Sequence, residues 1–310
     1  SGRTAAASRR WSRNSMTRDP NRLPDFLGVG PPRTGTTWLH RALIGRVGLP
    51  ARVKEINFFD VYYDNGMDWY RSHFQHCDPA LPMGEVCNYF AFPKARERIQ
   101  AHMPKCKIIV SLRDPVERAY SHYKLMRCRA YTKAGLEEFL ATRPQVTGAN
   151  RYAFHLADWF ARFGREQVLV LLYDDLRADQ QAYYDRVCDF LGIARESLAG
   201  KRGLHDSVNS FSTMPRSHKL AQNARHVRVY LKRNRAYRTI NLLDRIGAWE
   251  FCFGGGPRYP RLTMDQDARV RTLFAPEVDA LEKLLQIDLS RWKLPQPGVA
   301  ASAPASRAAG

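Results

Sequence analysis

Short apolar runs, separated by polar or glycine-rich segments, recur through the first two-thirds of the chain. One lies within 25–38, a second spans 107–112 and a third lies within 166–176. Continuous apolar runs of this length are typical of strands that are buried on both faces of a parallel sheet. We therefore predict three such strands, the first of which continues through a Gly/Pro-rich loop into a helix.

Three other segments show helical spacing of apolar residues. Residues 182–191 follow the third predicted strand, and Gly192 is a suitable end for that helix. The residues that define the other two apolar faces are Leu220, Val227 and Leu231 in 216–238, and Val278, Leu281, Leu284 and Leu285 in 278–292. Strands that alternate with helices predict an α/β fold, a three-layer sandwich whose central parallel sheet is flanked by helices.

The loop after the first predicted strand has the spacing of a phosphate-binding loop. Gly30 and Gly35 fit the Walker A pattern G-x-x-x-x-G, which makes the expected fold P-loop-like. The next residue is Thr36, however, where a nucleotide triphosphatase has Lys, and the loop carries its cation inside as Arg33. Backbone N–H groups and the helix dipole favour an anion here. The loop therefore predicts a phosphate site that does not hold ATP in the Walker manner, with an ordinary strand–loop–helix turn as the alternative.

Arg113 directly follows the second predicted strand. In open α/β sheets, ligands bind beyond the carboxyl ends of the strands. Asp114 and Pro115 fit the N-cap and the first position of a helix, and Ser121 lies about two turns into that helix. Because the fork of an arginine suits a phosphate in charge and geometry, Arg113 is a candidate phosphate ligand. The alternatives are a salt bridge at a strand end for Arg113 and an ordinary helix serine for Ser121.

Both segments resemble motifs of the sulfotransferases that use 3′-phosphoadenosine 5′-phosphosulfate (PAPS). Residues 32–38 are similar to the 5′-phosphosulfate loop of that family, and Arg113 with Ser121 match the residues that hold the 3′-phosphate. The resemblance implies PAPS as sulfuryl donor and adenosine 3′,5′-bisphosphate (PAP) as product. The cofactor-binding residues that it implies are Arg33, Thr34, Gly35, Thr36, Thr37, Trp38, Arg113, Ser121, Tyr173 and Arg258. Trp38 and Tyr173 match residues that meet the adenine, and core packing is the alternative for both.

A second stretch is similar to the heparan-sulfate-type members of that family. Residues 54–60 read Lys-Glu-Ile-Asn-Phe-Phe-Asp, and the family's catalytic base is the Glu before the Phe-Phe pair, here Glu55. A positioned carboxylate can take the proton of an attacking hydroxyl or amine. A solvated charge beside an aromatic core pair is the alternative for Glu55. Relatives often have Glu-Lys-Ser/Thr near 84–90, where this chain has Glu85 followed by Val86, and Glu85 is either an acceptor contact or a structural acid.

The glycine-rich stretch 253–260 resembles a loop that closes over the nucleotide in this family. Three successive glycines allow close backbone approach, and Arg258 supplies a charge for the 3′-phosphate. A Gly-rich hairpin or linker is the alternative.

The composition fits one enzyme domain with two tails. We expect a basic disordered tail at 1–22, a sulfotransferase domain at 23–295 and a second disordered tail at 296–310. The first tail also has the composition of a transit peptide, and Met16 is a candidate natural start. The sequence has no apolar run of membrane-spanning length.

The 6 cysteines are scattered, without C-x-x-C pairs or zinc-ligand spacing. Reduced cysteines in a cytoplasmic protein are the simplest interpretation. The resemblance adds that Golgi relatives commonly carry a disulfide near the C-terminal loop, where this chain has Cys252 alone. That difference favours a bacterial, cytoplasmic enzyme, and the expected chemistry requires no metal.

The chain is strongly basic, with 49 Lys and Arg against 30 Asp and Glu and a net charge of +19. The densest stretch, from Arg216 to Arg238, contains no acid and is predicted to form a basic amphipathic helix. A solvated basic face is one interpretation. An anionic partner is the other: a sulfated or uronic-acid glycan, an acidic carrier protein, or a membrane surface. No recognised nucleic-acid module is present, and no specific nucleic-acid partner is expected.

Together these observations predict a sulfotransferase that moves the sulfuryl group from PAPS to a hydroxyl or amine of an acceptor. The acceptor is expected to be a carbohydrate or another glycosylated or natural-product substrate, either a small molecule or a glycan, in some cases anionic or carrier-bound. Glu55 would act as base and Arg33 would stabilise the leaving phosphate during in-line displacement. The alternatives are a P-loop-type small-molecule kinase, which the missing Lys after Gly35 disfavours, and a non-enzymatic polyanion- or nucleic-acid-binding protein.

Overall fold

The computed structural model describes residues 19, 21–201, 204, 213–234 and 236–295. The chain divides into two compact units, which are Ser1–Arg113 with Phe154–Val208, and Asp114–Ala153 with Asn209–Gly310. Most of the expected tails 1–22 and 296–310, and the candidate start at Met16, lie outside the described residues. Among the helices of the described ranges, none is long and apolar enough to cross a membrane.

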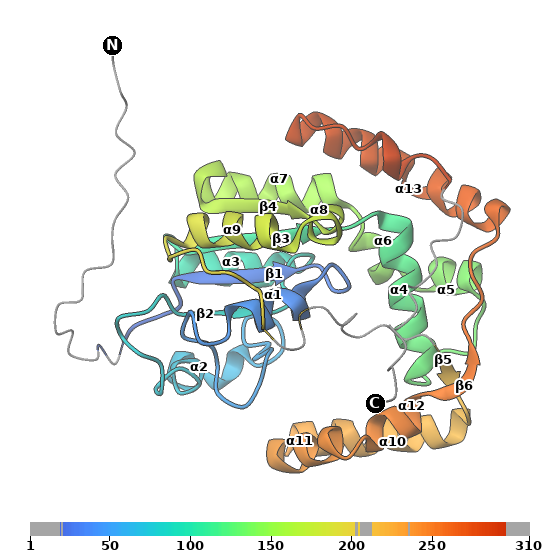
Figure 1. Cartoon of the computed structure of the whole chain (residues 1–310), viewed down its shortest axis with the longest axis horizontal. Helices are drawn as coiled ribbons and strands as arrows, with labels where there is room; N and C mark the ends of the chain where they lie inside the picture. The colour runs from blue at the N-terminus through green and yellow to red at the C-terminus, as the bar shows by residue number, and fades with distance from the viewer. Residues whose placement is uncertain (1–18, 20, 202–203, 205–212, 235, 296–310) are drawn as a thin grey trace. The chain divides into compact units, whose positions relative to one another are not determined.

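The first unit is built on a parallel four-stranded sheet (Figure 1). Its strands, in the order in which they lie side by side, are β2 (Gly84–Val86), β1 (Phe26–Gly30), β3 (Lys107–Leu112) and β4 (Val168–Leu172). The parallel sheet and the three apolar strands of the sequence prediction are confirmed. β2 has only three residues, too few to give an apolar run. β4, one of the two edge strands, is only partly buried, whereas β2 at the other edge is fully buried.

Helices flank this sheet, as predicted. The helices and turns of the first unit are α1 (Thr36–Leu43), η1 (Tyr63–Asn65), α2 (Met67–Arg71), α3 (Pro93–His102), most of α7 (Tyr152–Phe163), η2 (Arg165–Gln167), α8 (Tyr173–Ala178) and α9 (Gln180–Leu191). Phe26, Ile109 and Leu171 form one buried cluster with side chains of α1 and α9. Leu27 and Ile108, which point to the opposite face because strand side chains alternate, are also fully buried. The core of this unit therefore lies on both faces of the sheet.

Two local details in this unit refine the sequence prediction. The helix expected at 182–191 begins two residues earlier, where Asp179 accepts a hydrogen bond from the backbone of Ala182, and it ends at Gly192 in the left-handed conformation. The third predicted strand, expected within 166–176, ends at Leu172, and the short helix α8 follows it directly, so Tyr173 is a helical residue.

The second unit contains α4 (Pro115–Cys128), α5 (Leu136–Thr142), α6 (Pro144–Gly148), α13 (Met264–Leu285) and η3 (Ser290–Trp292) around one apolar cluster. Asp114 caps α4 as predicted and accepts hydrogen bonds from the backbone of Val116 and Glu117. The buried guanidinium of Arg271 on α13 binds Asp114 at 2.8 Å and Asp267 at 2.6 Å. This ion-pair group joins α13 to the start of α4.

The prediction of a helix over 278–292 is wrong in its bounds. The capping box of Thr263 and Gln266 starts α13 at Met264, and Gln286 in the left-handed conformation ends it at Leu285. Val278 and Leu281 are buried as the spacing indicated. The apolar spacing identified the buried face but missed the polar residues that set the two ends.

The same unit contains α10 (His218–Arg233), α11 (Tyr237–Arg245) and α12 (Ala248–Phe253), with an antiparallel pair formed by β5 (Thr213–Pro215) and β6 (Gly255–Arg258). The glycine-rich loop expected at 253–260 is thus largely a strand. A Cβ at Gly256 would lie 2.8 Å from the Met214 carbonyl oxygen, so glycine there permits the close approach of β5.

The predicted amphipathic helix within 216–238 is confirmed as α10, but of its predicted apolar face only Leu231 packs against the buried cluster. Ala221 and Ala224 are buried in a cluster with Trp249, whereas Leu220 and Val227 are 36% and 50% exposed. The small alanines let α12 approach closely, which turns the larger side chains outward.

Candidate active site

The loop between β1 and α1 is held in shape by hydrogen bonds within the first unit. The Thr34 hydroxyl donates to the Pro31 carbonyl at 2.7 Å, and the Ser111 hydroxyl on β3 donates to the Thr34 carbonyl at 2.5 Å. The Tyr183 hydroxyl on α9 donates in turn to Ser111 at 3.1 Å. These bonds fix a curved backbone at the N-terminus of α1, where the N–H groups of the first turn and the helix dipole favour an anion.

Left-handed backbone conformations give this loop its curvature. Gly30, Arg33 and Gly35 have φ angles of 88°, 78° and 93°. A Cβ at Gly35 would lie 2.9 Å from Leu176 and 3.1 Å from the ring of Tyr173. Glycine at this position therefore allows both the turn and the close packing of α8 against the loop.

Arg113 lies beside the loop at the end of β3. Its guanidinium stacks over the Tyr173 ring at 4.5 Å, and its Nη1 atom lies 3.4 Å from the carbonyl oxygen of Arg33. The structure therefore brings Arg33, Arg113 and Tyr173 together, although they are far apart in sequence. Two guanidinium groups on one loop and one strand end are suited to a ligand with more than one phosphate.

Glu55 lies next to the same loop through Lys54. The Lys54 ammonium is 2.7 Å from Oε1 of Glu55 and 3.4 Å from the hydroxyl of Thr36. The two side chains are 21% and 30% exposed, so solvent and a ligand can both reach them. Phe58 and Phe59 are fully buried and fix the segment that carries Glu55.

The other predicted site residues are distributed differently. Trp38 is 6% exposed and packs edge-to-face on Tyr183, with 5.5 Å between ring centroids, so the structure places it in the core. Thr37, the second residue of α1, is half-buried. Ser121 and Arg258 belong to the second unit, where Ser121 is buried on α4 and Arg258 is exposed at the end of β6. Their contacts with a nucleotide stay predictions.

Comparison with known proteins decides the family. Residues 23–234 match the family model described as the sulfotransferase domain. The chain belongs to the sulfotransferase family. This confirms the resemblance to PAPS-dependent sulfotransferases and makes the protein a member of that class of transferases.

Two curated relatives are similar in sequence to the sulfotransferase domain of this chain. It is 31% identical over 207 residues to the bifunctional heparan sulfate N-deacetylase/N-sulfotransferase 4 of Mus musculus. It is also 31% identical over 207 residues to the bifunctional heparan sulfate N-deacetylase/N-sulfotransferase 3 of Homo sapiens. Each match covers 59% of this chain but only 23% of the relative, so the chain spans under a quarter of the length of these proteins.

A solved bacterial structure shares the fold of this chain over most of the length of both proteins. The crystal structure of a sulfotransferase from Alicyclobacillus acidocaldarius superposes with a TM-score of 0.64 at 21% identity. The match covers 88% of this chain and 99% of that one. The α/β architecture with a central parallel sheet is therefore confirmed as a sulfotransferase fold.

Glu85, for which the sequence left two interpretations open, lies in the core of the first unit. This side chain is fully buried on β2, and its residue pairs with Leu27 of β1. Burial raises the pKa of Glu85 to about 8, and the polar groups of Tyr89 and the Ile56 backbone nearby oppose this only in part. Its full burial is what the interpretation as a structural acid expects.

An open cavity of about 430 Å³ lies beside the Lys54–Glu55 pair. Its lining residues are His40, Ile44, Gly45, Val47, Leu49, Pro50, Arg52, Val53, Lys54 and His76. The cavity thus combines aliphatic walls with basic side chains, and none of the Asp and Glu residues that the structure describes lines it. It is large enough to take part of a small molecule or a sugar.

Sequence reasoning missed two residues of this site, Lys54 and His40. Burial, followed by the nearby charge of Lys54, lowers the pKa of His40 to about 4, so its imidazole is neutral at pH 7. His40 follows Thr36 by four residues, which places both on one face of α1. The four-residue spacing of Thr36 and His40, and the position of Lys54 directly before Glu55, are the sequence features from which these two residues could have been identified.

Proposed function

We propose that the protein transfers the sulfuryl group of PAPS to a hydroxyl or amine of an acceptor and releases PAP. The observation that carries this proposal is the Lys54 ammonium, which joins the candidate base Glu55 to Thr36 of the phosphate loop. A proton acceptor beside an anion site is what sulfuryl transfer needs, because the acceptor must lose a proton near the transferred group.

Donor binding is assigned to the phosphate loop and to the residues that match the family's 3′-phosphate motif. The backbone N–H groups of 33–37 and the side chain of Arg33 would hold the 5′-phosphosulfate. Arg113 and Ser121 would hold the 3′-phosphate, with Arg258 as a further contact. Tyr173, which is fixed against the loop by Arg113, would meet the adenine. Trp38 would support the loop from the core rather than stack on the base.

The chemical step follows from these placements. The acceptor oxygen or nitrogen attacks sulfur while Glu55 takes its proton, and the bond between sulfur and the 5′-phosphate oxygen breaks. Arg33 and the loop N–H groups stabilise the charge that develops on the leaving phosphate. Lys54 orients the carboxylate of Glu55 by a charge-assisted hydrogen bond. The scheme routes no step through a metal.

The cavity beside Lys54 supports an assignment of the acceptor side. We assign it to a carbohydrate or another glycosylated or natural-product acceptor, free or carrier-bound. Arg52 and His76 on its wall suit an acceptor that carries an anionic group. The difference from the disulfide pattern of Golgi relatives supports a bacterial enzyme that works in the cytoplasm.

Thermal stabilisation by nucleotides tests the proposal. PAP should raise the unfolding temperature, whereas ATP and AMP should not, and Arg113→Ala should abolish the PAP effect. At a PAP concentration 100-fold above Kd the stabilisation should be about 2.7 kcal/mol. Arg195→Ala is the matched control, because Arg195 is exposed and pairs only locally with Asp189. An equal response to ATP would favour the kinase alternative, and no response to PAP would refute the donor assignment.

A further inference from the structure

The helices α10, α11 and α12 of the second unit expose an unusual share of apolar side chains. They pack against one another around Trp249 and Phe253. Of the 16 exposed large hydrophobic residues in the described ranges, seven lie on these helices or directly between them: Leu220, Val227, Val229, Tyr230, Leu242, Ile246 and Phe251. Exposed apolar groups at this density mark an interaction surface.

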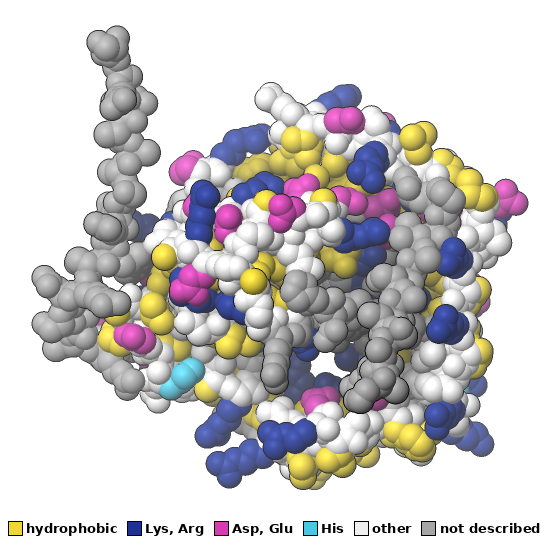
Figure 2. All heavy atoms as spheres, in the orientation of Figure 1, with side chains coloured by type: hydrophobic (Ala, Val, Ile, Leu, Met, Phe, Trp, Pro, Cys, Tyr) yellow, Lys and Arg dark blue, Asp and Glu magenta, His cyan; other side chains and the backbone are white. Residues whose placement is uncertain are grey.

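These side chains recur at helical spacing. Val227 and Tyr230 lie three residues apart on α10, and Leu242 and Ile246 lie four apart at the end of α11, so each pair lies on one side of its helix. Figure 2 shows hydrophobic side chains beside Lys and Arg side chains along the edge where Figure 1 draws α10 and α11. We call 213–258 the α10–α12 surface.

The α10–α12 surface is strongly cationic. Its described Lys and Arg residues are Arg216, Lys219, Arg225, Arg228, Lys232, Arg233, Arg238, Arg245 and Arg258. Its only acids are Asp244 and Glu250, and Asp244 is paired with Arg228 at 3.5 Å. The charge of this surface is therefore complementary to an anionic partner.

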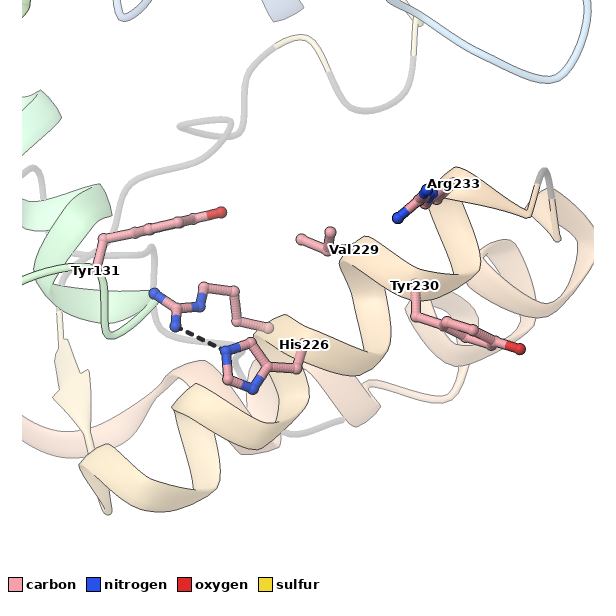
Figure 3. A pocket seen from close by; sticks show the side chains of 6 residues that line it. Tyr131, His226, Val229, Tyr230 and Arg233 are labelled. Atoms are coloured by element: carbon pink, nitrogen blue, oxygen red, sulfur yellow. Dashed lines mark hydrogen bonds between the residues drawn. The ribbon is translucent and has the colours of Figure 1, made fainter.

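A pocket of about 500 Å³ opens on this surface (Figure 3). It is lined by Tyr131, Arg225, His226, Val229, Tyr230 and Arg233. Arg225 is fixed by a 3.1 Å hydrogen bond to the Ala130 carbonyl, a 3.0 Å contact with His226, and stacking at 4.5 Å on Tyr131. In Figure 3 Val229 and Arg233 extend from α10 on the side that faces Tyr131. The pocket thus combines the guanidinium groups of Arg225 and Arg233 with the apolar side chain of Val229.

The environment of His218 is further evidence that the electrostatic potential at this surface is positive. Burial lowers the pKa of His218 at the start of α10, and Lys133, Arg127 and Arg225 lower it further. Cations from α4, from the segment after it and from α10 therefore act on the same point.

We propose that the α10–α12 surface docks onto a bilayer that contains anionic phospholipids. A headgroup phosphate would enter the pocket between Arg225 and Arg233, and Val227, Leu242 and Ile246 would enter the interfacial region of the lipids. Helices that carry Lys or Arg beside exposed aliphatic side chains bind membrane surfaces in this way. An acidic glycan would use the cations but would gain little from exposed valine, leucine and isoleucine, and this favours the bilayer.

Co-sedimentation of the full chain with vesicles tests the proposal. Binding to vesicles of phosphatidylcholine with phosphatidylserine should exceed binding to phosphatidylcholine alone, and it should fall as salt increases. Arg233→Glu and Ile246→Asp should each weaken binding roughly tenfold, because each removes a favourable contact and adds a repelled charge. All these positions are exposed, so the unfolding temperature should not change.

Matched substitutions on α13 of the same unit serve as controls. Leu273→Asp and Lys283→Glu change an exposed aliphatic residue and an exposed cation outside the surface, and they should leave vesicle binding unchanged. Equal loss in all four variants would overturn the proposal, as would binding that does not depend on phosphatidylserine. Binding to heparin that the same surface variants abolish, without vesicle binding, would assign the surface to an acidic glycan instead.

Discussion

Lys54 and Glu55 are consecutive in sequence and form an ion pair of 2.7 Å at the edge of the phosphate loop. Neighbouring side chains in an extended segment normally point in different directions. Here the irregular backbone before Phe58 lets the Lys54 ammonium reach both Glu55 and Thr36. The pair therefore couples the donor loop to the candidate base, and the first two predictions concern it.

Replacement of Glu55 by Gln should reduce turnover with little change in nucleotide affinity. The amide keeps the shape of the side chain but cannot take a proton from the acceptor, so kcat should fall by roughly 10² to 10⁴. Steady-state kinetics with PAPS and calorimetric titration of PAP provide the two measurements. Glu97→Gln, which removes an exposed carboxylate on α3, is the control. Turnover near the wild-type value in Glu55→Gln would remove the base assignment.

Lys54→Met should lower kcat roughly 10- to 100-fold, because one charge-assisted hydrogen bond to Glu55 is worth about 1.5–3 kcal/mol. Lys54→Arg keeps the charge and should retain part of the activity. If Lys54 acts through Glu55, Lys54→Met should have little further effect in the Glu55→Gln background. Multiplicative losses in the double variant would show that the two residues act independently.

Gly35→Ala should weaken PAP binding by the donor loop, whereas the same substitution at Gly45, another glycine with positive φ, should not. Gly35 has φ 93° and its added Cβ would meet Leu176 at 2.9 Å, whereas Gly45 has φ 77° and no atom within 4 Å of an added Cβ. Both alanine variants store backbone strain of about 1–3 kcal/mol. Only Gly35→Ala should also weaken PAP binding, as measured by calorimetry. Equal PAP affinity in both variants would mean that the packing of α8 does not shape the site.

Glu85→Gln should alter how stability depends on pH. Burial raises the pKa of Glu85 from 4.5 to about 8, so the folded protein keeps a proton that the unfolded chain has already lost. Its contribution to stability is full below pH 4.5 and is lost as the pH rises to about 8. Glutamine stays neutral, so the variant should gain stability relative to the wild type across this window by up to about 1.4 kcal/mol per pH unit. Urea unfolding at several pH values measures this, and a constant difference would contradict it.

Arg271→Met should strongly destabilise the second unit. Arg271 is 4% exposed and binds both Asp114 and Asp267, so its loss leaves two buried carboxylates without their cation. The expected cost is about 3–5 kcal/mol. Arg269→Met on the same helix removes an ion pair with Glu137 in which both side chains are more than half exposed, and it should cost no more than about 1 kcal/mol. Similar urea midpoints for the two variants would show that the buried group is not an anchor.

The sequence was sufficient for those parts of the fold that local patterns determine. β3 coincides with its apolar run, and the N-cap at Asp114 and the glycine stop at Gly192 are where their residue types indicated. Strand β2 was missed because its three residues are buried by neighbouring strands rather than by a pattern of their own. The orientation of α10 was missed because two alanines, which carry little hydrophobic signal, form its contact with α12.

For the candidate site, motifs identified residues but not their partners. Arg113, one of the residues that the resemblance named, contacts two others, the Arg33 carbonyl and the Tyr173 ring. Lys54 and His40 acquire their roles through contacts between α1 and the segment before Phe58, and such tertiary contacts leave no periodic signal in a sequence. The burial of Glu85 likewise depends on its strand lying at the side of β1, which a single polar residue cannot reveal.

The hydrogen bonds that hold the phosphate loop come from residues that are synthesised much later than the loop itself. Ser111, which holds the Thr34 carbonyl, lies 77 residues further along the chain, and Tyr183, which holds Ser111, lies 72 residues beyond that. A ribosome therefore releases the loop long before either of its supports. During synthesis the early chain must pass through a period in which its anion site has no fixed shape, and the site becomes competent only when α9 has emerged and docked.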